Sequence, residues 1–444
     1  MPQFLDSFNM QVLQKKSRLR DMFEKGRVSE LDNDLKELLV GNWNPLCSSA
    51  LKREIIAVDG SRALRRSASG AYWYVIRSLA LLRKDRFREL EIDAFLSKST
   101  STDVDQFISV KTEHQEFEVA RKAIIESDLS NVALLIDGSL YGRMTHLPRD
   151  MPPEGAKDFM LKYFSTYYEL LELCKKRKIL IIGVSKDSMS SFLRNYFLSI
   201  LFTKELRILS DIDPEDRRRL LSIFDQIFIR PSFAMIPFRE LKLKYGSRLA
   251  RIESILNEAF STRPDHQMIR NHINKAGFSS PIELTASGRN VDLIKRIQTS
   301  PEAFIKQYFK GALLEHNNES KFIEDAKKSL DLLSSFPTFV SFHVLLDARD
   351  TPVRVDTPNW TFDRELCIGD LDHALPTSDD LSEIVGLLVA GYGGLKNYNI
   401  WLKRVDQEVK LSRKTLDELY SPILEKALGL QIVHTRGYRR VKYP

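Results

Sequence analysis

Two segments of the sequence each join a short apolar run to the same three residues, Asp-Gly-Ser. Residues 54–61 contain Asp59, and residues 132–140 contain Asp137. Each apolar run has the length of a buried β-strand, and the Asp-Gly that follows is a turn signal. One such turn signal alone is more simply a strand end, but the repetition, with serine after each, favours a shared site. We expect both carboxylates at one rim of a sheet, where they favour Mg²⁺ or Mn²⁺, because these ions prefer oxygen ligands.

A third acidic ligand is expected from the helix predicted over residues 103–127. This segment offers Glu113, Glu116 and Glu118. Their positions around the helix leave the choice between them open.

The order of the predicted elements gives the fold class. We predict strands over residues 54–58, 70–82 and 87–95, a helix over 103–127, a strand over 132–137, a helix over 155–177 and a strand over 179–184. Three antiparallel strands followed by helix, strand, helix and strand is the order of the RNase H-like fold. In that fold, acids at the ends of the first and fourth strands bind catalytic metal. We therefore predict an α/β protein with an RNase H-like mixed sheet flanked by helices.

The remaining segments add to this core. We predict a helical N-terminal segment over residues 1–45 with a packing or dimerisation role, the first part of the core over 46–195, and a large, mainly helical insertion or cap over 196–336. Residues 337–444 complete the core with two late strands and end in helices and a basic tail.

Composition excludes several classes of protein. The chain is 43% hydrophobic and 29% charged, and it has no unbroken apolar run of the ~18 residues that a membrane span requires. No secretory signal is visible at the N-terminus, so we expect a cytoplasmic protein. The three cysteines lie far apart and form no Cys-x-x-Cys, so the sequence supports neither a disulfide framework nor a zinc knuckle.

The charge balance is mildly basic. The chain has 67 Lys and Arg against 60 Asp and Glu, a net charge of +7 that fits a solvated surface as well as a polyanion partner. Two clusters are more informative, because basic residues beside carboxylates can hold phosphates. The first follows Asp59 and the second closes the chain. Their members are Arg62, Arg65 and Arg66, then Arg436, Arg439, Arg440 and Lys442.

Four motifs in order resemble those of the NurA nucleases. They are Ala57-Val58-Asp59-Gly60-Ser61, Phe117-Glu118-Val119, Leu135-Ile136-Asp137-Gly138-Ser139-Leu140 and Val184-Ser185-Lys186-Asp187-Ser188. The resemblance covers residues from about 50 to 195 and from about 338 to 415. It implies an RNase H-like core, DNA cleavage with Mn²⁺ or Mg²⁺, a homodimer, and work with the hexameric ATPase HerA in resecting double-strand ends.

The resemblance also implies roles for single residues. An acid between two apolar residues favours Glu118 as the third ligand. Lys186 matches a lysine that can neutralise the scissile phosphate, although an exposed lysine at a strand end is the simpler explanation. Asp356, within Arg354-Val355-Asp356-Thr357-Pro358, is a further ligand or an acid that supports the ligands. It is equally a strand-end residue before a turn.

The C-terminal part departs from the family pattern. Tyr398 and Leu402 match it, but Asn399 replaces a proline and Asp406 stands where the family has histidine. Aspartate can bind a hard cation but cannot deliver a proton near neutral pH as imidazolium does. We predict catalytic roles for Tyr398 and Asp406, and base stacking by Tyr398.

Together these features predict metal-dependent phosphodiester hydrolysis with two ions, as a 5′–3′ exonuclease and single-strand endonuclease on DNA. The predicted nucleic-acid contacts are Arg62, Arg65, Arg66, Lys186 and Tyr398. No phosphate-binding Gly-x-x-x-x-Gly-Lys-Ser/Thr occurs, so movement along DNA needs a partner motor. The alternatives are a non-catalytic DNA-end-binding subunit that docks on a translocase, and an RNase H-like nuclease acting on RNA or in defence.

Overall fold

The structure is a computed structural model that falls into two compact units. It describes residues 2–25, 29–47, 52–127, 129, 131–261, 263–285, 288–370 and 375–433. The first unit contains Met1–Pro45, Asp187–Ser280 and Ala348–Val353, and the second contains Leu46–Lys186, Pro281–Asp347 and Arg354–Pro444. The predicted basic tail, from Arg436 to Lys442, lies outside the described residues.

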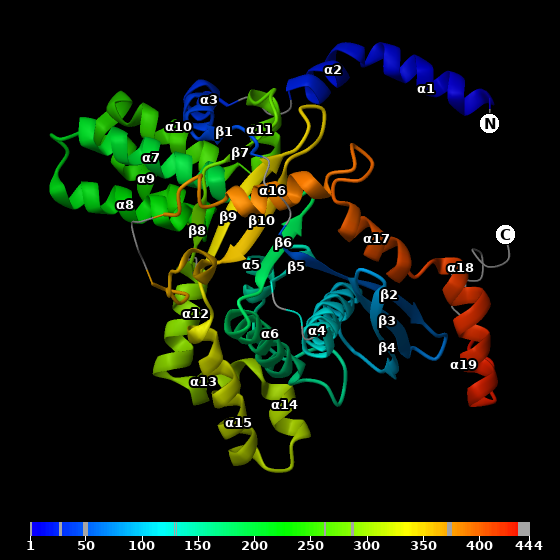
Figure 1. Ribbon diagram of the computed structural model, residues 1–444. Helices are drawn as coiled ribbons and strands as arrows, with labels where there is room; N and C mark the ends of the chain where they lie inside the picture. Colours follow the sequence, from blue (N-terminus) through cyan, green and yellow to red (C-terminus); the bar gives the residue numbers. More distant parts are fainter. Residues whose placement is uncertain are drawn as a thin grey trace. The chain divides into compact units, whose positions relative to one another are not determined.

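The second unit is built on a mixed sheet with the strand order β4-β3-β2-β5-β6-β10-β9, and β8 pairs with β9 (Figure 1). Strands β2, β3 and β4 are antiparallel neighbours, and β2, β5 and β6 are parallel ones. This arrangement confirms the predicted α/β class with its RNase H-like order. The strands are β2 (Glu54–Arg66), β3 (Tyr72–Leu82), β4 (Asp85–Phe95), β5 (Val132–Asp137), β6 (Leu180–Ser185), β8 (Ile282–Leu284), β9 (Phe339–Leu345) and β10 (Val353–Pro358).

Strand β2 corrects one prediction. Asp59 does not lie in a turn, because β2 continues through Gly60 and pairs with β3 as far as Arg66. What ends near Asp59 is the parallel pairing with β5, whose last pair is Val58 with Ile136. The long antiparallel pairing with β3 keeps the chain extended where the local Asp-Gly-Ser signal predicts a turn. By contrast, β5 does end at Asp137, and Gly138 follows in the left-handed region with φ 110°.

Helices cover both faces of this sheet (Figure 1). Side chains alternate along a strand, so Gly60 faces α4 (Ser101–Ser127) while Asp59 and Ser61 face the side of α17 (Ile400–Val409). The other helical segments of this unit are α5 (Leu140–Met144), α6 (Phe159–Lys176), α12 (Gly288–Thr299), α13 (Pro301–Tyr308), α14 (Lys310–Glu315), α15 (Glu319–Asp331), η2 (Leu332–Ser335), η3 (Asn359–Phe362), α16 (Ser382–Gly391), α18 (Arg413–Thr415), η4 (Leu416–Tyr420) and α19 (Ser421–Leu428).

The first unit is mainly helical. The buried side chain of Arg194, on α7, pairs with Glu258 on α10, and the main-chain N–H of Arg194 donates to Asp265 on α11. Arg194 therefore links these three helices. The elements are α1 (Pro2–Gln14), α2 (Lys16–Lys25), α3 (Asp32–Gly41), β1 (Trp43–Asn44), α7 (Phe192–Ile208), α8 (Pro214–Ile227), α9 (Pro231–Tyr245), η1 (Gly246–Leu249), α10 (Ala250–Phe260), α11 (Asp265–His272) and β7 (Gly277–Ser279).

The two units divide the chain differently from the predicted segments. The predicted insertion over 196–336 is split at Ser280, because β8 pairs with β9 and so joins residues 281–336 to the sheet. The residues before that point form one unit with the N-terminal segment.

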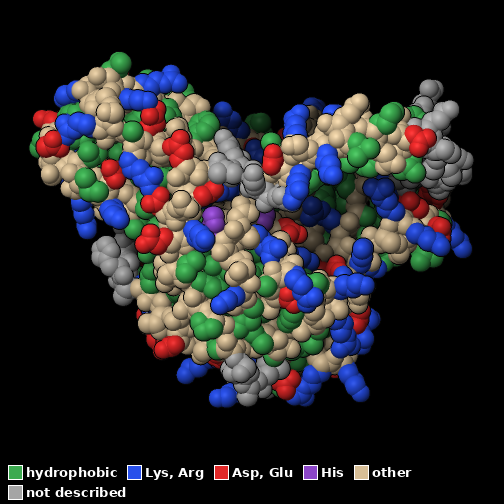
Figure 2. All heavy atoms as spheres, turned by 90° about the horizontal axis from the view of Figure 1, so that it is seen from above, with side chains coloured by type: hydrophobic (Ala, Val, Ile, Leu, Met, Phe, Trp, Pro, Cys, Tyr) green, Lys and Arg blue, Asp and Glu red, His purple; other side chains and the backbone are tan. Residues whose placement is uncertain are grey.

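The surface is mixed in charge. On the face shown in Figure 2, Lys and Arg side chains are spread over most of the surface, with Asp and Glu among them. Within the described ranges, no helix has the length and apolar character to cross a membrane. Because both signs of charge are mixed on this face, the net positive charge does not identify a binding surface. A binding site has to be identified from the contacts of individual residues.

Candidate active site

The site starts from two neighbouring strands of the sheet. Asp59 on β2 and Asp137 at the end of β5 each lie one position beyond the last parallel pair. Burial, together with the charges of Glu116, Asp137 and Asp406, raises the pKa of Asp59 to about 8. Mutual repulsion of this kind requires the acids to lie close together. The structure therefore brings Asp59 and Asp137 together, as the two Asp-Gly-Ser segments predict.

Glu116 is the third acid of the cluster. It projects from α4 and is only 5% exposed. A Cβ on Gly60 would lie 2.6 Å from its Oε1, so the absent side chain of Gly60 is what lets the carboxylate reach β2. Arg143 donates from Nη2 to Glu116 Oε2 at 2.5 Å and to the carbonyl oxygen of Asp137 at 2.9 Å. Burial raises the pKa of Glu116 to about 7 despite this ion pair.

Glu118 lies elsewhere. Two residues along a helix turn the side chain by about 200°, so Glu116 and Glu118 point to opposite sides of α4. The Glu118 side chain is 43% exposed and lies 3.6 Å from Lys162 and 3.6 Å from His114. The structure thus brings Glu116 to the two aspartates, and it does not bring Glu118. From the helical pattern alone, Glu116 is one of three open candidates. The family pattern favours Glu118, which lies two residues further along α4 and away from the aspartates.

Glu113, the other alternative, belongs to a neighbouring network. Its Oε2 accepts a hydrogen bond from Tyr163 at 2.7 Å and lies 2.9 Å from His146 Nε2. Although burial opposes it, these bonds and the nearby charge of Arg143 lower the pKa of Glu113. Glu113 is therefore a charged support for Arg143, which in turn holds Glu116.

Lys186 and Tyr398 close the other side of the cluster. Lys186 Nζ lies 2.8 Å from Asp137 Oδ2 and 5.0 Å from the centre of the Tyr398 ring. The Tyr398 hydroxyl donates to the same Asp137 oxygen at 3.4 Å. Burial lowers the pKa of Lys186, but the charge of Asp137 and its hydrogen bond, with the charges of Asp59 and Asp406, together outweigh this and the net shift is upward. Burial, with the charges of Asp137 and Asp59, raises the pKa of Tyr398. Both predicted residues thus contact the cluster.

Asp406 reaches the cluster from α17. Its Oδ2 pairs with Lys403 at 3.0 Å, and its charge contributes to the raised pKa of Asp59. Asn399, which replaces the family proline, caps this helix, because its side chain accepts hydrogen bonds from the main-chain N–H groups of Trp401 and Leu402. The departure from the family pattern therefore supplies the start of the helix that carries Asp406.

Asp356 supports the cluster without joining it. The residue is fully buried, and Ser341 donates to its Oδ1 at 2.8 Å. Its Oδ2 accepts from Ser139 at 2.5 Å and from Arg354 at 3.0 Å. Both oxygens are engaged, and through Ser139 Asp356 holds the segment that follows Asp137.

The three arginines predicted to contact nucleic acid lie in different places. Arg62 donates to Ser109 at 2.9 Å and lines a cavity of about 400 Å³ together with Glu116 and Asp137. Arg65 lies on the opposite face of β2, where it pairs with Asp417 at 3.4 Å. The guanidinium of Arg66 lies 5.3 Å from the centre of the Tyr72 ring. Of the three arginines, only Arg62 lines the cavity beside the acids.

The acids suit a hard divalent cation. Among the residues that the structure describes, no three acidic, His or Cys side chains already stand in metal-ligand geometry. Arg143 and Lys186 instead lie against Glu116 and Asp137. Burial and nearby negative charge raise the pKa values of Asp59 and Glu116, and a divalent cation would stabilise the charged forms of these acids. Asp59, Glu116 and Asp137 would hold such an ion, with Asp406 nearby.

This cluster predicts that Mn²⁺ binding strengthens as pH rises. The raised pKa values, about 8 for Asp59 and about 7 for Glu116, mean that the folded protein retains protons there at neutral pH. A cation must displace these protons, so the Kd for Mn²⁺ should fall about 10-fold or more between pH 6 and pH 8. Isothermal titration calorimetry in buffers of different ionisation enthalpy measures both the Kd and the protons released. A pH-independent Kd with no proton release would contradict this assignment.

The chain is similar to proteins of a known family. A family model described as the NurA domain matches residues 53–411. The fold is similar to a crystal structure of the NurA nuclease from Sulfolobus solfataricus, with a TM-score of 0.51 and 13% identity over 97% of this chain and 98% of that one. A NurA structure bound to dAMP and manganese gives a TM-score of 0.46 and 17% identity over 93% and 96% of the two chains. Comparison with curated proteins found no match.

Proposed function

Since the chain belongs to the NurA family, we propose that it is a metal-dependent deoxyribonuclease that hydrolyses phosphodiester bonds at DNA ends. The observation that carries this proposal is the gathering of Asp59, Glu116 and Asp137 at one point of an RNase H-like sheet. Asp59, Glu116 and Asp137 would hold divalent ions, two in our proposal, whose chemistry would be to activate a water and to neutralise charge on the phosphate.

The protein's own residues have separate roles in this reaction. Asp59, Glu116 and Asp137 hold the cation. Lys186, now paired with Asp137, is placed to contact a phosphate oxygen once a cation takes over that carboxylate. Tyr398 orients Asp137 through its hydroxyl. Asp406 adds negative charge near Asp59.

We further propose that the protein works in the cytoplasm as a homodimer with a HerA-type hexameric ATPase in double-strand end resection. The resemblance implies both partners, and the sequence has no phosphate-binding loop with which to hydrolyse ATP. Helix α1 carries exposed apolar side chains, among them Phe4, which is 85% exposed, and Phe8, which is 63% exposed. These side chains support the proposal that the N-terminal segment packs against a second copy of the protein.

A cleavage assay tests the proposal. Purified protein should degrade single-stranded DNA and duplex ends with Mn²⁺, and should leave them intact with EDTA. Binding of DNA ends without any cleavage would instead support a non-catalytic subunit of a translocase. Preferential cleavage of RNA in a competition between the two substrates would support an RNA-directed enzyme.

A pair of variants on α4 tests the third ligand. We expect Glu116→Gln to reduce the cleavage rate by at least about 100-fold, or ~2.7 kcal/mol of transition-state stabilisation. Glu118→Gln is the matched control on the same helix, and its rate should stay within about 2-fold of the unmodified protein, because Glu118 faces away from the aspartates. The opposite ranking would restore Glu118 as the ligand.

A further inference from the structure

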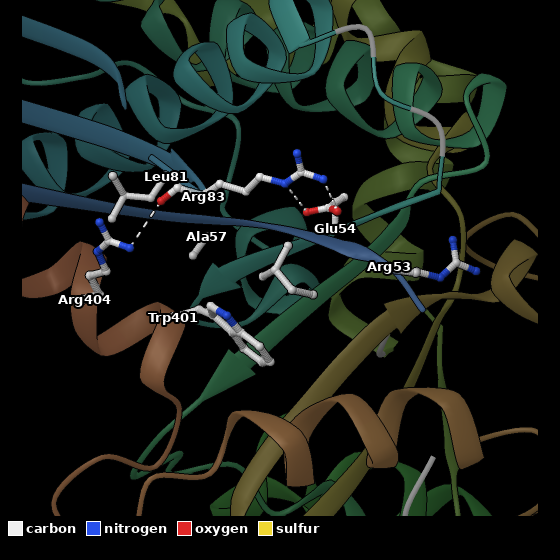
Figure 3. Close-up of a pocket in the computed structure, with 8 residues that line it drawn as sticks. Arg53, Glu54, Ala57, Leu81, Arg83, Trp401 and Arg404 are labelled. Atoms are coloured by element: carbon white, nitrogen blue, oxygen red, sulfur yellow. Dashed lines mark hydrogen bonds and ion pairs between the residues drawn. The ribbon is translucent and has the colours of Figure 1, made fainter. Parts of the chain in front are cut away.

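A second cavity lies near the start of β2, where side chains of β2 and β3 face Trp401 and Arg404 (Figure 3). It measures about 190 Å³. Ile55, Ala57 and Leu81 supply apolar lining from the sheet, and the indole of Trp401 lines it from α17. Arg83 and Arg404 also line it, so the cavity combines an apolar interior and an aromatic ring with polar groups. This combination is typical of a site for a flat heteroaromatic ring with polar edges.

The size of the cavity limits what can enter. A cavity of ~150 Å³ is known to hold benzene, so about 190 Å³ accommodates one planar ring system and not a complete nucleotide. A ring that enters can stack on the Trp401 indole, which is a general way to hold an unpaired base.

The rim favours a neutral ring over an anion. Arg83 pairs with Glu54 through two hydrogen bonds, one of them 2.8 Å. Arg404 pairs with Glu408 at 3.3 Å and donates to the main-chain carbonyl of Arg83 at 3.2 Å. Arg83 is paired with Glu54, whereas Arg404 shares Glu408 with Arg86, whose hydrogen bond to that carboxylate is 2.7 Å. Most of the positive charge at the rim is therefore paired and is not free to bind a phosphate. The same groups still offer donors and acceptors to the polar edge of a base.

The cavity is within one or two nucleotides of the proposed cleavage site. Side chains alternate along β2, so Ile55 and Ala57 face the same side of the sheet as Asp59. At ~3.3 Å per residue, Ala57 lies about 7 Å and Ile55 about 13 Å along the strand from Asp59. Helix α17 spans both places, since it carries Trp401 at the cavity and Asp406 near Asp59.

We propose that this cavity binds one unpaired nucleobase of the strand whose phosphodiester bond lies at Asp59 and Asp137. The inference rests on the proposed nuclease function and specifies its substrate as a strand with an unpaired base next to the cut. A paired base cannot enter, because its polar edge and both its faces are occupied in the duplex. The cavity therefore selects frayed or single-stranded ends.

Binding without cleavage tests this inference separately from the nuclease activity. A short single strand carrying 2-aminopurine is titrated with the full-length protein in EDTA, and the fluorescence change on stacking is followed. Trp401→Ala should weaken binding by about 10-fold, since stacking on one aromatic ring is worth ~1–3 kcal/mol per base. Trp401→Phe should restore most of the affinity. Ile400→Ala is the matched control, because Ile400 neighbours Trp401, is 45% exposed and does not line the cavity.

Further measurements keep the inference decidable. Ala57→Leu fills the cavity while keeping Trp401, and it should also weaken binding of the strand; this variant decides the matter if circular dichroism shows that Trp401→Ala is unfolded.

Free 2-aminopurine deoxyribonucleotide, titrated alongside, tells whether the cavity takes a base of a strand or a mononucleotide alone, and binding of the mononucleotide alone overturns the proposal. Equal affinity of all variants for the strand also overturns it, even if the unmodified protein cleaves DNA. Failure to cleave with Mn²⁺ despite Trp401-dependent binding would instead refute only the nuclease.

Discussion

Asp59→Asn and Asp137→Asn should each abolish Mn²⁺-dependent DNA cleavage, by at least about 1000-fold, while the protein stays folded. This loss corresponds to ~4 kcal/mol of transition-state stabilisation, which is reasonable for a residue that holds the metal. The fold should survive because Asp59 is already destabilised by burial and by neighbouring acids, which raise its pKa to about 8. At neutral pH Asp59 is therefore mostly protonated, and asparagine, which is also uncharged, should fit the same place. Asp137→Asn also loses the 2.8 Å pair with Lys186, so its melting temperature should fall slightly.

The measurement is the initial rate on a labelled single strand with Mn²⁺, accompanied by thermal unfolding of each variant. Asp105→Asn serves as the control, because Asp105 is an exposed acid on α4 outside the cluster. Both site variants should still bind DNA in EDTA. Retained cutting by either one would remove the corresponding aspartate from the mechanism.

Gly60→Ala should be nearly as damaging, although it adds only a methyl group. The new Cβ would lie 2.6 Å from Glu116 Oε1 and 2.7 Å from Thr112 Cγ2, closer than atoms can approach. Either Glu116 moves away from β2 or α4 shifts, and both disturb the metal ligands. We expect the cleavage rate to fall by about 100-fold and the Kd for Mn²⁺ to rise by about 10-fold, since misplacing a ligand slightly is enough to lose catalysis.

The matched control is Gly41→Ala at the end of α3, where an added Cβ would meet nothing within 4 Å. This substitution should change neither rate nor metal affinity. A Gly60→Ala variant with ordinary activity would mean that Glu116 has room to adjust, and that its approach to β2 is not what positions the ligand.

Local patterns in the sequence predict most of the sheet. The apolar runs before Asp59 and Asp137 correspond to β2 and β5, and the element order gives the RNase H-like class. Strand β2 is longer than predicted, because pairing with β3 as far as Arg66 outweighs the local turn signal of Asp-Gly. Pairing with another strand cannot be predicted from the residues of the segment itself.

The third acid shows a different limit. Whether Glu116 or Glu118 faces the aspartates depends on how α4 is rotated against β2, and this rotation is fixed by contacts that a helical pattern does not contain. The absent side chain at Gly60 is one such contact. Arg143 was outside the prediction altogether, because nothing in its neighbourhood in the sequence distinguishes it from a surface arginine. Only its burial between Glu116 and the Asp137 carbonyl does so.

Tyr398 donates to Asp137 across 261 positions of the chain, and Asp406 follows it on α17. A ribosome that has completed every strand of the sheet has therefore not yet synthesised these two residues. The last strand, β10, ends at Pro358, so Tyr398 and Asp406 join a set of acids whose strands all precede them in the chain. A product that stops before Tyr398 would keep Asp59, Glu116 and Asp137 but lack the hydroxyl that contacts Asp137 and the carboxylate of Asp406.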